Sequence, residues 1–103
     1  MAGNVPRTAP PVTVNDAGNP EAFVATRQCK HVSIRENPQA SGYPRQFGVR
    51  TTLSDDTHWY DGMATHVFTC PGGPDRLWAI GETVGYAETA SGTGSTTFLP
   101  YEY

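Results

Sequence analysis

The chain has 103 residues, a formal net charge of −3 and a pI of about 5.4. This length is enough for one domain at most. The acidic balance argues against non-specific nucleic-acid binding, which needs clustered Lys and Arg. Eleven glycines and nine prolines favour loops and strands over helices. No apolar run approaches the roughly 20 residues of a membrane-spanning helix, so we expect no membrane partner.

Residues 1–20 are predicted to form an extended, proline-rich arm. Their four prolines remove backbone donors and fix φ, which excludes a helix or a central strand. At about 3.1 to 3.3 Å per residue, the arm could reach on the order of 60 Å, far beyond its own domain. A simple unstructured tail is the alternative. The segment Val12-Thr13-Val14 could instead add to a sheet as a short edge strand.

Residues 21–103 are predicted to form an all-β domain. Short apolar or alternating segments are separated by turn signals, a pattern typical of an antiparallel β-sandwich or barrel. The clearest alternation is Gln46–Leu53, where Phe47, Val49, Thr51 and Leu53 would share one buried face. We expect a jelly-roll-like sandwich of seven or eight short strands, at residues 23–26, 29–35, 46–53, 58–60, 63–70, 76–80, 83–87 and 95–99.

Charge is unevenly distributed along this domain. Residues 21–50 hold five basic and two acidic residues, a net +3, whereas residues 51–103 hold one basic and seven acidic residues, a net −6. The two halves either complement each other inside one domain or form a polar surface that orients neighbours in an assembly. A domain this small is marginally stable alone, so we expect homo-oligomerisation to help by burying more apolar surface.

Two cysteines and two histidines give the sharpest metal hypothesis. Cys29 and His31 are two positions apart, and His66 and Cys70 are four apart, so on strands each pair would share a face. Two such strands side by side would offer a tetrahedral set suited to zinc. The simpler interpretation is free, buried thiols in a protein made in a reducing cytoplasm, because the N-terminus lacks the apolar core of a signal peptide. A disulfide between the two cysteines is a third possibility.

Catalytic patterns are weak in this sequence. The Asp55-Asp56-Thr57-His58 segment places two carboxylates beside a histidine, but neighbouring residues of an extended chain point in different directions and solvated turns are rich in Asp. The chain has no nucleophile elbow, no phosphate loop and no His-Glu-x-x-His motif. We therefore predict a non-enzymatic protein without a cofactor. A small metal-dependent enzyme built on the Cys/His set is an alternative.

Aromatic residues provide a separate signal. Trp59, Tyr60 and Trp78 on one exposed face would suit a carbohydrate-binding module, because rings on a β-sandwich form sugar platforms. Packing in the core is the other interpretation of each tryptophan. Tyr101 and Tyr103, the last aromatic residues of the chain, are predicted to anchor on a neighbour or on the domain's own edge.

Two stretches of the chain resemble small bacteriophage virion proteins. In those proteins a "Cys-basic-x-Val-x-Ile" strand leads into an "Asn/Asp-Pro" turn, as in residues 27–38 here, and the late strand at residues 94–102 also fits. The likeness covers roughly a third of the chain and departs after Tyr43, where Arg45-Gln46-Phe47-Gly48 stands.

The resemblance implies a capsid decoration or cement protein with a jelly-roll-like sandwich, often trimeric. A component of a virion fibre or collar is the alternative that it also implies. Its partners would be the major capsid protein and further copies of itself, and it would lie on the capsid surface of the virion after synthesis in the host cytoplasm. The arm and the C-terminal tyrosines would then carry the contacts. These predicted partner-binding residues are Val5, Pro6, Arg7, Pro10, Pro11, Val12, Val14, Tyr101 and Tyr103.

Overall fold

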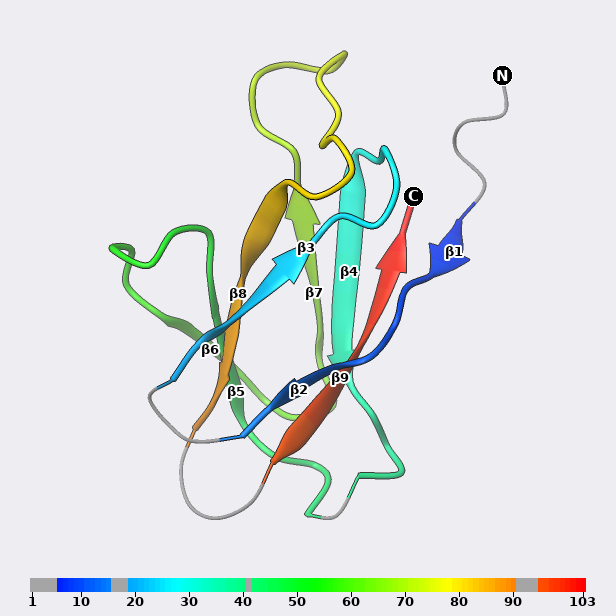
Figure 1. Ribbon diagram of the computed structural model, residues 1–103. Coiled ribbons are helices and arrows are strands. Elements are labelled where there is room, and N and C mark those ends of the chain that lie inside the picture. Colours follow the sequence, from blue (N-terminus) through cyan, green and yellow to red (C-terminus); the bar gives the residue numbers. More distant parts are fainter. Residues whose placement is uncertain (1–5, 16–18, 41, 91–94) are drawn as a thin grey trace.

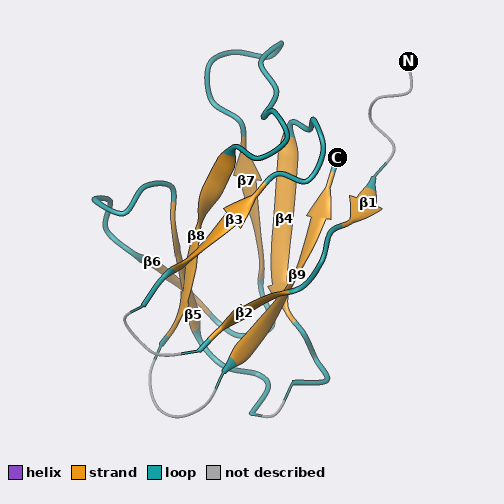
Figure 2. Cartoon of the chain, in the orientation of Figure 1, coloured by secondary structure: helices purple, strands orange, loops and turns teal. Residues whose placement is uncertain are grey.

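Two antiparallel sheets form the whole fold in the computed structural model of the protein, which describes residues 6–15, 19–40, 42–90 and 95–103. Within these ranges every regular element is a strand (Figure 2), and no helix there could span a membrane. The strands are β1 Arg7–Thr8, β2 Val12–Val14, β3 Glu21–Val24, β4 His31–Glu36, β5 Phe47–Arg50, β6 His58–Tyr60, β7 Thr65–Thr69, β8 Thr83–Thr89 and β9 Thr96–Glu102.

The two sheets pack face to face as a sandwich (Figure 1). Sheet A has the order β1-β9-β4-β7, with β2 also paired to β9, and sheet B has the order β3-β8-β5-β6. The predicted all-β sandwich is therefore confirmed. The structure describes nine strands rather than seven or eight, because two lie in the arm. The finer description as a jelly roll stays a prediction.

The core lies between the sheets and is built around aromatic rings. Phe98 of β9 meets Phe23 and Phe47 of sheet B edge-on, with ring centroids 6.0 and 5.2 Å apart. Phe68 of β7 lies over Gly85 of β8, where any side chain would overlap the ring. Large rings therefore fill the space between two sheets of short strands, a space that aliphatic residues alone would fill less completely.

The arm folds back onto its own domain over residues 7–14. β1 and β2 pair antiparallel with β9, and Val14 is fully buried in the core. The outer edge of β9 carries unpaired backbone groups, and the arm satisfies them. These residues thus form an edge of sheet A, as proposed for Val12-Thr13-Val14, instead of reaching toward a distant neighbour.

Pro100 explains why β9 is longer than predicted. The sequence pattern ends this strand at residue 99, yet it continues through Pro100 to Glu102. The carbonyl of Pro100 accepts a hydrogen bond from the amide of Ala9 at 3.1 Å, so the nitrogen of Pro100 also faces the arm. The arm residues opposite Pro100 lie in the link between β1 and β2 and do not pair with β9 as a strand, so they need no backbone donor from it. The missing N–H therefore costs no ladder bond.

Two other predicted strands are wrong in extent. β5 ends at Arg50, and Leu53 lies 57% exposed in a turn, not on the buried face. The turn is closed by Asp55, whose carboxylate accepts from the amide of Thr52 at 3.1 Å. Residues 76–80 form no strand, only an isolated bridge from Trp78 to Cys29. In both places local polar contacts replace the sheet ladder that alternation predicted.

Candidate binding surface

The outer face of sheet A is a regular array of side chains. Residues opposite each other on antiparallel strands share a face, and the register of β9, β4 and β7 places Arg35 between Leu99 and Thr65. The buried partners of this array, such as Val32 and Ile34, point inward. The next two rows of the outer face are Tyr101, Ser33, Val67 and Tyr103, His31, Thr69.

A groove of about 600 Å³ crosses this face. The small side chain of Ser33 lies at the centre of the array, with the larger Tyr101 on one side and Val67 on the other. The arm runs beside β9 (Figure 1). Its residues Thr8, Ala9 and Pro11 line one side of the groove. The lining residues of the whole groove are Thr8, Ala9, Pro11, Ser33, Arg35, Thr65, Leu99, Pro100 and Tyr101.

The groove has one charged lining residue, Arg35. Its side chain makes no hydrogen bond or ion pair with the described part of the chain. The other lining groups are hydroxyls and apolar surface. Since apolar side chains such as Leu99, Pro11 and Tyr101 line the groove beside Arg35, the surface can bind an apolar ligand that also carries a negative charge.

The predicted partner-binding residues divide into two groups in the structure. Pro6, Arg7, Pro10, Pro11 and Tyr101 are exposed, whereas Val12 is half-buried and Val14 is buried. Tyr103 packs against His31, with ring centroids 5.1 Å apart. Val5 lies outside the described residues. Two of these residues, Pro11 and Tyr101, line the groove, and Val14 holds the arm in place.

The proposed glycan platform is not assembled. Trp78 is 3% exposed and belongs to the core. Tyr60 stacks on Phe47, with ring centroids 5.5 Å apart, and faces the interior. Only Trp59, 43% exposed, stands on the outer face of sheet B. A single ring gives a weak sugar contact compared with the coplanar pair or triplet that a platform needs.

The four candidate zinc ligands are likewise separated. Cys29 and Cys70 are buried free thiols, as the simpler interpretation predicted. His31 lies on the outer face, where Nδ1 is 3.1 Å from the hydroxyl of Thr69, and His66 lies at the inner face. Cys29 precedes β4, so strand alternation does not hold between it and His31. Within the described ranges no three Cys, His, Asp or Glu residues come together as metal ligands.

His66 and its neighbours form a second polar feature, at the open edge of the sandwich between β6 and β7. Nδ1 of His66 is 3.0 Å from the hydroxyl of Tyr60, and burial followed by the charge of His58 lowers the pKa of His66 from 6.5. A cavity of about 160 Å³ adjoins these rings, with Asp55 and Asp56 at its rim. The hydrogen bond between Tyr60 and His66 joins β6 to β7.

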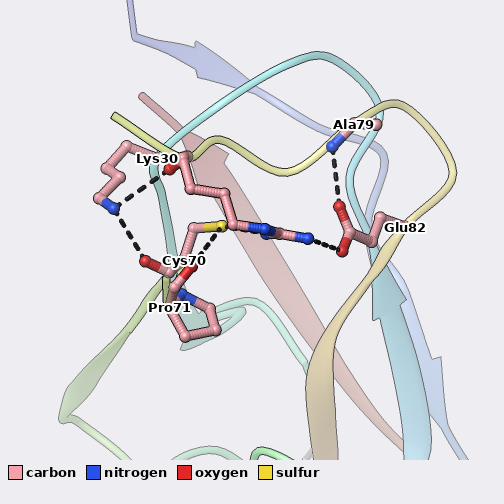
Figure 3. A network of polar contacts seen from close by, with 6 residues as sticks. Lys30, Cys70, Pro71, Ala79 and Glu82 are labelled. Atoms are coloured by element: carbon pink, nitrogen blue, oxygen red, sulfur yellow. Dashed lines mark hydrogen bonds and ion pairs between the residues drawn. The ribbon is translucent and has the colours of Figure 1, made fainter. Parts of the chain in front are cut away.

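A network around Lys30 fixes the long loop between β7 and β8 (Figure 3). The ammonium of Lys30 donates to the carbonyls of Cys70, Gly73 and Arg76, at 2.9, 2.6 and 3.1 Å. Arg76 in turn bonds Sγ of Cys70 and the carboxylate of Glu82, both at 2.6 Å. The hydrogen bond from Arg76 lowers the pKa of Glu82. The charged groups of Lys30, Arg76 and Glu82 all take part in these contacts, so the network holds the backbone of the loop in place.

Three buried glutamates were not anticipated from the sequence. Both oxygens of Glu102 accept from Thr26, at 2.7 Å from its amide and 2.6 Å from its hydroxyl. Glu36 accepts from the amide of Arg45 at 2.8 Å, and Glu88 from the guanidinium of Arg50 at 2.8 Å. Each carboxylate ties a loop or a neighbouring strand to a sheet. A glutamate in an alternating strand gives no sequence signal of burial, because its polar side chain is assigned to the exposed face of the strand.

Comparison with protein-family models, with curated proteins and with solved structures finds no match to this chain. The functional inference therefore depends on the geometry of the outer face of sheet A and on the sequence resemblance.

Proposed function

We propose that the protein is a non-enzymatic binding domain that engages a partner protein through the groove of sheet A. The observation that carries this proposal is the groove itself, about 600 Å³ in volume and lined mainly by apolar side chains and hydroxyls. Exposed, contiguous apolar surface on a small domain marks an interaction site. Cys70, one of the four candidate zinc ligands, is occupied in a structural contact with the guanidinium of Arg76.

The partner we propose is the major capsid protein of a bacteriophage, with the domain serving as a capsid decoration or cement protein. The sequence resemblance supports this assignment, and two antiparallel sheets packed as a sandwich suit a scaffold role. A protein that reinforces a shell needs a stable fold and an accessible contact surface. On this proposal the protein lies on the virion surface, and further copies around a symmetry axis would add contacts.

Filling the groove tests the proposal. Ser33 lies at its floor with its side chain outward, so Ser33→Tyr should fold normally and occupy the space. The assay is co-sedimentation with empty phage shells that lack their decoration layer, prepared from the phage that encodes this chain. We expect binding to fall at least about tenfold, because the ring displaces the partner from its contact area.

The matched control is Thr83→Tyr, which adds the same ring at an exposed position of sheet B outside the groove lining. This variant should bind shells like the wild type. Equal binding by Ser33→Tyr and the wild type would show that the groove is not the contact surface. Failure of the wild-type protein to bind shells would refute the capsid partner.

A further inference from the structure

We infer that the groove receives an extended acidic segment of the partner protein, with one carboxylate held by Arg35 and apolar side chains on either side of it. The inference rests on the proposed function, since it names the chemistry of the partner at the same site. It goes further by assigning the determinant of specificity to one residue, Arg35.

The position of Arg35 fits this role. It stands on β4 between Leu99 and Thr65, one row away from the small Ser33. A guanidinium presents a planar fork of donors that matches a carboxylate in a bidentate pair. The hydroxyls of Ser33 and Thr65 line the same groove and can accept or donate to the backbone of a bound segment.

The distribution of charge on the face favours an acidic ligand. Among the described residues of β4, β7 and β9, no carboxylate points to the outer face, because Glu36 and Glu102 point inward and are buried. Arg35 is therefore uncompensated on its own surface, while the chain as a whole has a net charge of −3. A basic segment would meet the like charge of Arg35 in a groove whose lining holds no carboxylate, so complementarity selects an acidic one.

The apolar surroundings favour a polypeptide over a small carboxylate. Tyr101 and Val67 stand on opposite sides of Ser33 and are 42% and 43% exposed. Pro11 and Leu99 extend the apolar surface to the arm. A ligand that fills the groove and also covers Val67, which lies beside it, must cross all three strands. An extended segment does this with alternate side chains, which gives a pattern of apolar, acidic and apolar residues.

A positional-scanning library of acetylated, amidated hexapeptides tests the inference on the intact protein. The measurement is fluorescence polarisation of the labelled peptide pools. We expect the wild type to select Asp or Glu at one central position and apolar residues two positions before and after it, because alternate side chains of an extended segment share a face. Arg35→Gln should weaken binding of the selected pool about tenfold, and Arg35→Glu should exchange the acidic preference for Lys or Arg.

Two comparisons separate charge recognition from other effects. Gln28→Glu makes the net charge one unit more negative, as Arg35→Gln does. Gln28 is exposed and precedes the start of β4, away from Arg35, so this variant should bind like the wild type. Arg35→Lys keeps the charge but loses the fork, so it should retain the acidic preference with lower affinity. Thermal unfolding of each variant establishes that it is folded.

The possible failures are distinct. Selection of peptides without an acidic position, or selection unchanged in Arg35→Glu, overturns the inference while leaving the groove as a peptide site. No peptide binding by the wild type, together with shell binding that Ser33→Tyr abolishes, shows that the groove reads a folded surface and also overturns the inference. No binding of either kind refutes the proposed function as well.

Discussion

At the scale of single residues, buried polar side chains make specific contacts that hold the two sheets and their loops together. Glu102 ends β9 and receives both donors of Thr26, so it joins sheet A to the segment that follows β3. A buried carboxylate that keeps its hydrogen bonds is tolerated, whereas removal of its donors leaves an uncompensated charge. His66 is the residue whose protonation state has the clearest consequence for stability.

His66 should make the protein less stable as the pH falls below its ordinary pKa. Burial and the neighbouring His58 lower the pKa of folded His66 from 6.5. The unfolded chain therefore binds a proton before the folded chain does. The free energy of unfolding should begin to fall as the pH drops through 6.5 and should stop falling below the folded-state pKa. Asp55, Asp56 and Arg50 line the adjoining cavity and set the remaining local charge.

Urea unfolding at about pH 7.5 and about pH 5.5 measures this loss. His66→Gln keeps a polar partner for Tyr60 but cannot titrate, so it should lose less stability over this interval than the wild type. His31→Gln, on the outer face, leaves His66 intact and should show the wild-type loss. An equal loss in the wild type and in His66→Gln would rule out His66 as the cause.

At the scale of elements, β2 decides whether the arm belongs to the domain. Val14 is fully buried, whereas Val12 on the same strand is only half-buried. Removal of two methyl groups from a buried valine loses transfer energy and leaves a cavity. The arm therefore contributes to the core as well as to the edge of sheet A, and the groove depends on its position.

We expect Val14→Ala to lower the free energy of unfolding by about 2 kcal/mol, and Val12→Ala by less than about 1 kcal/mol. Urea unfolding gives both values, and limited proteolysis reports whether the arm is released. Trypsin should cut Val14→Ala faster than Val12→Ala after Arg7, an exposed residue of β1 in the arm. Identical stability of the two variants would mean that the arm contributes nothing to the core.

Much of the fold, but little of the site, could be predicted from the sequence. Alternation located β4 and β7, because half-buried strands alternate. The extent of β9 was missed, since the rule that proline ends a strand ignores which side its nitrogen faces. Arg35 was not singled out, because an arginine on the polar face of a strand is ordinary. Its significance comes from the neighbours that β9 and β7 place beside it, which are far away in sequence.

At the scale of the whole molecule, the two thiols report on the integrity of the sandwich. Cys29 is 1% and Cys70 is 2% exposed, and the backbone of Cys29 pairs with that of Trp78 in an isolated β-bridge. Burial, followed by the charge of Glu102, raises the pKa of Cys29 to about 11. A thiol that is both covered and protonated does not react with a disulfide reagent. Reaction therefore requires the fold to open.

We expect a disulfide reagent to label neither cysteine in the native protein at about pH 8 and to label both over the same range of urea concentration. Single variants Cys29→Ala and Cys70→Ala assign each signal. In each variant, the urea concentration at which the remaining thiol becomes labelled should match the unfolding midpoint measured by tryptophan fluorescence. Labelling of Cys70 without urea would contradict this expectation and would show that the Lys30 network lets the loop open locally.

The place of β9 in sheet A has a consequence for how the protein is made. Residues 96–102 pair with residues 7–14 on one side and residues 31–36 on the other. These early segments therefore cannot complete their pairing in sheet A until the last strand has been synthesised. Pairings of such high sequence separation fold slowly. During synthesis β4 has an open edge until residues 96–102 leave the ribosome, and unpaired strand edges attract other chains. Translation rate and chaperone supply should therefore govern the yield of soluble protein more strongly than the stability of the finished sandwich.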